Sequence, residues 1–413
     1  MALLPAEPWR RNQWVMAATV FVVFSGFAFV LPFLPLYVRD LGVAEEERVA
    51  LWAGVLIGVS PLLAGLVAPY WGRLADRHGA KRIALVALGS YVVLLVLSGF
   101  VTSVGQLLAL RVGVGAFGAI GPLGLVMAAA LAPREETGRA VGLVQSAQIL
   151  AAAAGPVAGG LLADAVGIRA TFVVAGAICG LAFGLVALLY VATPPRERTG
   201  SSGGGASLAR FLAIPRAAPI LLILFFVNFI GRSFTPILPQ YMSELGVPAG
   251  RLASATGLLI SAYSVAAALS ASLFGRATAR RDPQRLLIAS LVGGTALVLP
   301  MAFVTNYASF MALAILLGLA AGGSLTLCYT IGGLLVEAEH RGAAFGYFSS
   351  AALFGGAISP TVAGALAHWG LRGIFYLNAA LYMALSLALI SYTATARPLG
   401  SRRGDGLGHG GQG

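Results

Sequence analysis

Apolar runs long enough to span a membrane recur along this chain from Trp14 almost to its C-terminus. A helix needs about 20 apolar residues to cross the hydrocarbon core of a bilayer, which is roughly 30 Å thick. The runs are continuous and lack the alternation of polar and apolar residues found in β-barrel strands. Because backbone groups in lipid must be hydrogen-bonded internally, the sequence predicts an all-α membrane protein.

Twelve spans are predicted, in two sets of six. Only 10% of the residues are charged, whereas soluble domains average roughly 25%, so no soluble domain is expected. The linker and the C-terminal tail are rich in Gly, which is typical of flexible chains. The predicted units are an N-terminal six-helix bundle (1–193), a cytoplasmic linker (194–216), a C-terminal six-helix bundle (217–394) and a disordered cytoplasmic tail (395–413). The spans lie near 14–37, 49–71, 83–102, 105–131, 140–164, 168–193, 217–240, 252–274, 285–304, 307–335, 343–366 and 371–394.

The distribution of Lys and Arg orients the predicted spans. Of 27 such residues, 20 fall in the tails and even-numbered loops, 5 in the odd-numbered loops and 2 within spans. By the positive-inside rule both termini are therefore cytoplasmic, in a multi-pass protein of a bacterial cytoplasmic membrane. The net charge of +12 follows from this topology and from attraction to anionic lipid, so no nucleic-acid partner is predicted.

The two sets of spans resemble each other at an offset of about 204 residues. The segment from Pro32 to Tyr37 corresponds to the segment from Pro236 to Tyr241, and Pro156 corresponds to Pro360. Matched Pro and Tyr at one offset indicate two parallel repeats. In transporters built from such repeats, the binding site lies at their interface near the middle of the membrane.

The loop after the second span is the most specific motif. It reads Gly72-Arg73-Leu74-Ala75-Asp76-Arg77-His78-Gly79-Ala80-Lys81-Arg82. This string resembles the signature loop of the major facilitator superfamily, whose fold has twelve helices in two pseudo-symmetric six-helix bundles. The resemblance implies that the loop latches the two halves together. It assigns gating roles to Gly72, Asp76, Arg77 and Gly79.

Two further motifs resemble those of the drug/proton antiporter branch of that superfamily. Arg111 and Gly115 lie in the fourth span, where the resemblance links the Arg to proton movement, and an intramembrane charge is by default functional. The fifth span carries Gly155, Pro156, Gly159 and Gly160, which resemble the motif of exporting members. Small residues allow close helix contact and Pro bends the helix, as an outer seal requires.

Carboxylates are absent from the middle of every predicted span. Exporters of cations commonly use a buried carboxylate, whereas the charges within these spans are Arg111 and Arg232, the latter beside Asn228. A cavity holding two arginines would repel a cation, so we expect anionic or neutral amphiphiles as substrates. Further hydrogen-bonding residues expected to line the cavity are Gln145, Gln148, Tyr263 and Tyr329.

Other classes of protein fit less well. The four His residues lie in loops, at span ends or in the tail, and Cys179 and Cys328 are isolated, so no catalytic triad, metal site or cofactor is predicted. No ATP-binding loop occurs, and an ion gradient, with protons implied by the resemblance, is the expected energy source. Asp76, Glu337 or a path near Arg111 would carry the proton. The chain is thus expected to be a monomeric, proton-coupled exporter of small molecules, with an importer of a small metabolite as the alternative.

Overall fold

A computed structural model gives the structure of residues 7–118, 124, 127–128, 133, 136–192, 217–335 and 341–395. Every regular element in these ranges is a helix. The predicted linker, the tail beyond residue 395 and Glu337 lie outside the described residues. Asp76 is described only in its backbone, as part of a helix.

The N-terminal half begins with a span interrupted by proline. Pro32 and Pro35 stand at the starts of two short helices that continue the first one, because proline lacks the N–H needed in a helix interior. The elements of this half are α1 (Pro8–Val30), η1 (Leu31–Phe33), α2 (Leu34–Asp40), α3 (Glu46–His78), α4 (Ala80–Ser98), α5 (Val104–Ala116), α7 (Thr137–Val166) and α8 (Ile168–Leu189).

The C-terminal half repeats this plan. Its first span is broken in the same way, between Ser233 and Leu238, and the two pieces meet at 48°. The elements are α10 (Ala217–Ser233), α11 (Leu238–Glu244), η3 (Ala249–Arg251), α12 (Leu252–Ala277), α13 (Pro283–Met301), α14 (Tyr307–Ala321), α15 (Ser324–Leu335), α16 (Arg341–Leu366), η5 (Ala367–Trp369) and α17 (Gly373–Thr395).

The helices account for the predicted spans in order. Within the described ranges, ten helical segments are long and apolar enough to cross a membrane, and the bent pair α10 and α11 makes an eleventh. The remaining span, the fourth, begins as the shorter helix α5, and most of its second part lies outside the described residues.

Two equivalent tyrosines show how closely the halves match. The Tyr37 hydroxyl donates to the Ser98 carbonyl oxygen at 2.7 Å, and the Tyr241 hydroxyl donates to the Met301 carbonyl oxygen at 2.8 Å. Each bond joins the end of a half's first span to the end of its third. The hydrophobic core is correspondingly divided into two clusters, one mainly from each half, with Ala253 and Ala50 each packed in the cluster of the opposite half.

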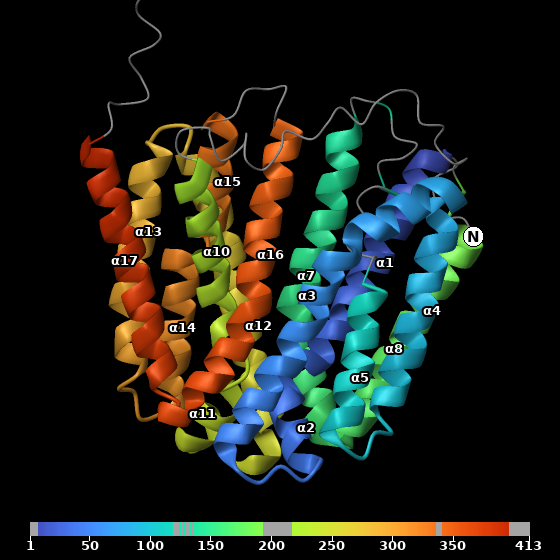
Figure 1. Cartoon of the computed structure of the whole chain (residues 1–413), viewed down its shortest axis with the longest axis horizontal. Helices are drawn as coiled ribbons and strands as arrows, with labels where there is room; N and C mark the ends of the chain where they lie inside the picture. The colour runs from blue at the N-terminus through green and yellow to red at the C-terminus, as the bar shows by residue number, and fades with distance from the viewer. Residues whose placement is uncertain are drawn as a thin grey trace, which may run out of the picture.

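The halves meet along two helix pairs, α3 with α16 and α7 with α12. Figure 1 shows the blue-to-green first half beside the yellow-to-red second half, with α2 and α11 together at one end of the molecule. We call this the sealed end. The opposite end, where α3 finishes at His78 and α4 begins at Ala80, is called the motif end.

Candidate functional site

A cavity of about 320 Å³ lies between the two halves. The first half contributes α1, α3, α4, α5 and α7 to its wall, and the second half contributes α10 and α16. The lining residues are Phe24, Phe27, Ala28, Leu31, Ile57, Ser60, Pro61, Ala64, Tyr91, Arg111, Val114, Gly118, Ala152, Asn228, Arg232, Ala352, Leu353, Gly356 and Ala357.

Arg111 reaches this cavity from α5 with its guanidinium unpaired. The residue is 1% exposed, and among the described residues none of its three guanidinium nitrogens has a hydrogen-bond partner. The guanidinium carbon lies 5.6 Å from the centre of the Phe172 ring, and the Ser60 hydroxyl donates to the Arg111 backbone carbonyl at 2.7 Å. A buried donor without an acceptor is costly. The side chain is therefore ready to accept an anionic or hydrogen-bond-accepting group.

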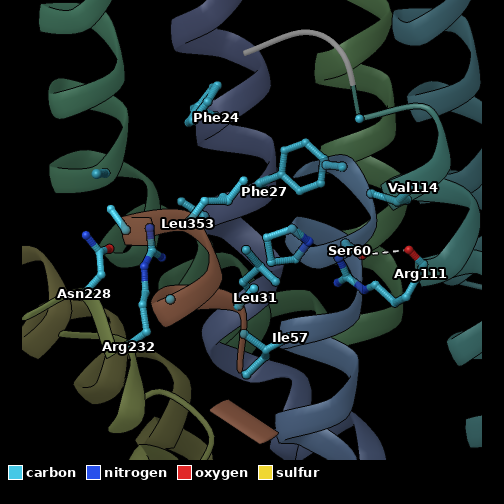
Figure 2. Close-up of a pocket in the computed structure, with 18 of the residues that line it drawn as sticks. Phe24, Phe27, Leu31, Ile57, Ser60, Arg111, Val114, Asn228, Arg232 and Leu353 are labelled. Carbon is cyan, nitrogen blue, oxygen red and sulfur yellow. Dashed lines mark hydrogen bonds between the residues drawn. The ribbon is translucent and has the colours of Figure 1, made fainter. Parts of the chain in front are cut away.

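Arg232 and Asn228 face the cavity from the opposite side. They lie one helical turn apart on α10, just before that span breaks, and Figure 2 shows both across the cavity from Arg111. Both pass close to Gly356 of α16, where an added Cβ would lie 3.4 Å from the Arg232 Cγ and from the Asn228 Oδ1. A glycine at 356 thus leaves room for the two polar side chains.

The cavity is electrostatically positive and otherwise mostly apolar. Neither Asp nor Glu occurs among the described residues that line it, and Phe24 and Phe27 on α1 form an apolar wall with Leu31 at the start of η1. Two cations lining one cavity, the buried Arg111 and the exposed Arg232, favour an anion and repel a cation. An elongated molecule with one acidic end and one apolar end matches this distribution.

The other predicted lining residues lie elsewhere. Tyr263 lines a separate cavity of about 90 Å³ within the second half, near the break between α10 and α11. Gln145 is exposed and Gln148 half-buried on α7, and neither belongs to the wall of the central cavity. Tyr329 donates to the Ser349 hydroxyl at 3.5 Å, also outside that wall.

The glycines of the fifth span lie in closely packed contacts, as expected. A Cβ at Gly155 would overlap Ala28, and one at Gly159 would overlap the backbone of Phe29, both on α1. Gly160 faces the other way, where a Cβ would overlap the Ala253 backbone of α12 in the second half. This motif therefore holds α7 against its own half and against the partner half at once. Gly115 makes a comparable contact inside the first half, where an added Cβ would lie 2.7 Å from the Ser60 carbonyl oxygen.

Two equivalent glycine and proline contacts join the halves. The Pro156 carbonyl oxygen of α7 lies against Gly257 of α12, and the Pro360 carbonyl oxygen of α16 lies against Gly54 of α3. A Cβ at either glycine would overlap that oxygen. The contacts stand in the parts of α3 and α12 nearest their starts, so the helix pairs are closed toward the sealed end.

Hydrogen bonds reinforce the same two helix pairs. The Val157 amide, which follows Pro156 on α7, donates to the Ser261 hydroxyl of α12 at 3.1 Å. In the other pair, the Thr361 hydroxyl of α16 donates to the Gly54 carbonyl of α3 at 3.3 Å. Proline bends a helix and interrupts its internal hydrogen bonding, which leaves neighbouring backbone groups available to another helix.

The motif end is arranged differently. Arg77 is exposed, and in the described part of the chain it makes no hydrogen bond or ion pair. Gly72 has open space where a Cβ would stand, and Gly79 adopts a φ of +88°, which allows the sharp turn from α3 into α4. Lys81 donates to the carbonyls of Ala187 and Tyr190 at 3.0 and 2.8 Å, so it binds the end of α8 inside the first half.

Sequence reasoning missed the lining residues Ser60 and Leu353 and the aromatic residues Phe24 and Phe27. A serine within a long apolar span could have drawn attention to Ser60. The others look like any lipid-facing residue of a span, because the rotation of each helix about its axis is set by packing against its neighbours.

Comparison with known proteins places this architecture in a family. The model of the Major Facilitator Superfamily matches residues 16–256 and 220–408. The chain is 31% identical to the multidrug resistance protein MdtG of Proteus mirabilis, covering 94% of this chain and 98% of the relative. It is likewise 31% identical to MdtG of Dickeya zeae, covering 91% and 92%.

Solved structures share the fold at low sequence identity. A bacterial homologue of the human lysosomal transporter Spinster, in an inward-facing and occupied conformation, matches with a TM-score of 0.77 and 16% identity, covering 95% of this chain and 98% of that one. The human organic anion transporter MFSD10 matches with a TM-score of 0.65 and 16% identity, covering 93% and 100%. The chain is a multi-pass membrane protein that belongs to the major facilitator superfamily of transporters.

Proposed function

We propose that this chain exports small amphiphilic compounds, anionic or neutral, from a bacterial cell by alternating access, driven by a proton gradient. The observation that carries the proposal is the cavity between the halves, in which Arg111 holds three unpaired guanidinium nitrogens opposite Arg232. No other buried group in the described chain offers a substrate so many free donors in a cavity.

The chemistry of the cavity supports this class of substrate. Arginine binds carboxylate, phosphate or sulfonate groups through paired N–H donors, and Asn228 adds a neutral hydrogen-bonding group beside Arg232. The apolar wall formed by α1 and η1 accommodates a hydrophobic body without specific shape. A solved neighbour with the same fold is described as an organic anion transporter, which is consistent with an anionic substrate.

Export is supported by the relatives and by the fifth span. The MdtG proteins are named for multidrug resistance, a phenotype that outward transport produces. The Gly155 to Gly160 segment packs against both halves in the manner of a seal. An importer of a small metabolite would share this fold, so the direction of transport is decided by the experiment below.

The proposed orientation is supported by the excess of Lys and Arg in the tails and even-numbered loops. In this proposal both termini and the motif end face the cytoplasm, and the sealed end faces outward, with the cavity accessible to the cytoplasm. The linker 194–216 tethers the two halves, and the protein works as a monomer surrounded by lipid. Asp76 and Arg77 would engage the second half when the motif end closes.

The coupling ion is proposed to be the proton. The described part of the cavity wall contains no carboxylate, and in this proposal the proton binds elsewhere, at Asp76, at Glu337 or along a path near Arg111. Protonation of one of these acids would favour either the inward-open or the outward-open conformation. This shift would couple the proton gradient to transport.

The test compares an anionic and a cationic dye in inverted membrane vesicles, whose outer face is the cytoplasmic side. With an imposed gradient, acid inside, vesicles containing the protein are expected to accumulate carboxyfluorescein and not the lipophilic cation rhodamine 123. An uncoupler should abolish the accumulation. Vesicles without the protein provide the baseline. Accumulation of rhodamine 123 in place of carboxyfluorescein, or dye release when the gradient is applied, would contradict the proposal.

A further inference from the structure

The sealed end contains a carboxylate from one half that caps a helix of the other. Asp164 stands near the end of α7, and its two oxygens accept hydrogen bonds from the Ser254 amide at 2.8 Å and the Ala253 amide at 3.3 Å. Both amides belong to the first turn of α12. The first amides of a helix have no partner within it, and a negative charge placed there also interacts favourably with the helix dipole.

This cap replaces a local one. Arg251 precedes α12 without offering a side-chain hydrogen bond to the helix start. In the described helices α5, α13 and α14, a Ser, Asp or Asn directly before the helix performs this task, as Asp282 does for α13 by accepting from the Gln284 amide at 3.0 Å. The start of α12 is therefore completed only when the second half lies against α7 of the first.

The equivalent position in the repeat also joins the halves. At an offset of 204 residues, Asp164 corresponds to His368 in η5, and the first turn of α12 corresponds to the first turn of α3. There the His368 ring contacts the Glu47 carboxylate of α3, again across the two halves. A third contact also crosses the halves, where the side-chain amide nitrogen of Gln240 donates to the Glu46 backbone carbonyl at 3.1 Å.

We infer that Asp164 is a gating residue that locks the sealed end, and that transport requires its cap on α12 to break and re-form in each cycle. The two hydrogen bonds exist only while α7 and α12 are in register at that end. Opening the sealed end separates these helices and leaves the first amides of α12 to water. The cap thus stabilises the conformation that is closed at the sealed end over the conformation that is open there. This effect does not depend on which compound is carried.

The charged groups near Asp164 do not compete for it. Arg251 precedes α12 and Arg169 follows on α8, and neither forms an ion pair with Asp164 within 4 Å in the described structure. The carboxylate is exposed and its hydrogen bonds to the described protein go to α12. Its removal is therefore expected to affect the contact between the halves more than the fold of either half.

The test measures the separation of the halves directly. Nitroxide labels at Phe100→Cys and Phe303→Cys, both exposed at the sealed end, report distances between the halves in the full-length protein after Cys179 and Cys328 are replaced by Ala. Losing a helix cap changes an equilibrium by roughly 2- to 30-fold. In Asp164→Ala the population with long distances is expected to rise within this range. In Asp164→Asn the rise should be smaller, because the amide oxygen can still accept one bond.

The matched control is Asp282→Ala, which removes a cap of the same chemistry inside a single half. It is expected to lower thermal stability without changing the distance distribution. An unchanged distribution in Asp164→Ala, or an equal change in Asp282→Ala, would overturn the inference. If Asp164→Ala does not fold, Asp164→Asn supplies the same comparison. The distance measurement needs no substrate. It therefore tests the role of Asp164 even if the proposed export function is wrong.

Discussion

Arg111 of the first half and Arg232 of the second half line one cavity, although they come from spans that are not equivalent in the repeat. At an offset of 204 residues, Arg232 corresponds to Ala28, which lines the same cavity without a charge. The repeat therefore supplies a symmetric frame, while the two charges are placed asymmetrically within it. This asymmetry gives each half one cationic group to present to a substrate held between them.

Replacing Arg111 should separate function from stability. In Arg111→Met the buried charge and its unpaired donors disappear, and because an uncompensated buried charge is costly, its replacement by an apolar side chain should be neutral or stabilising. We expect an unchanged or higher melting temperature in detergent together with loss of carboxyfluorescein transport. A melting temperature lowered by many degrees would indicate that Arg111 has a structural role instead.

Reversing the charge at Arg232 should change which dye is carried. Arg232→Glu places a carboxylate beside Asn228 in the cavity wall, opposite Arg111. The anion then faces one repulsive and one attractive group, so carboxyfluorescein transport is expected to fall at least tenfold, while rhodamine 123 becomes a substrate. Arg232→Gln serves as the neutral control and should weaken anion transport without admitting the cation. Unchanged selectivity in Arg232→Glu would place the substrate elsewhere.

The contact of Gly257 with Pro156 should be intolerant of any side chain. A Cβ added at Gly257 would overlap the Pro156 carbonyl oxygen. A Cβ added at Gly184 on α8 would point into open space. Gly257→Ala is therefore expected to separate α7 from α12 and to slow transport, and Gly184→Ala is expected to do neither. The labels at positions 100 and 303 measure the separation. Equal transport rates in the two variants would count against a tight seal at this contact.

The equivalent tyrosine hydrogen bonds should contribute similarly to the two halves. Tyr37→Phe and Tyr241→Phe each leave a buried carbonyl without its donor, at a cost of about 1 to 3 kcal/mol. Each variant should lower the melting temperature by a similar amount, with transport retained at permissive temperatures. A large effect from one variant and none from the other would show that the halves are not equally stabilised.

Much of the fold could be predicted from the sequence because lipid restricts the choices. Continuous apolar runs can only be helices in this setting, and matched prolines and tyrosines reveal the repeat before any contact is known. The break in the seventh span was not predicted, although Pro236 and Pro239 within it are its chemical cause. The expectation that the glycines of the fifth span pack closely agrees with the contacts of Gly155, Gly159 and Gly160.

The candidate site could be predicted only where a residue is chemically unusual for its surroundings. Arg111, Arg232 and Asn228 stand out in apolar spans, and the structure brings them to one cavity. Tyr263 and Gln145 are polar too, but their hydrogen-bonding groups can find partners at helix contacts or at the surface. Where each side chain points depends on how its helix is rotated about its axis. The role of Asp164 depends on the register between α7 and α12, which arises only when the halves pack.

The central claim is that both arginines bind the same anionic group. Its most direct test is the equilibrium affinity of purified protein for carboxyfluorescein, measured by fluorescence anisotropy in the wild type, Arg111→Met, Arg232→Gln and the double variant. Residues that share one bound group have non-additive effects. We predict that each single variant weakens binding at least tenfold and that the double variant loses less than the two losses combined. Wild-type affinity in either single variant, or strictly additive losses, would contradict the claim.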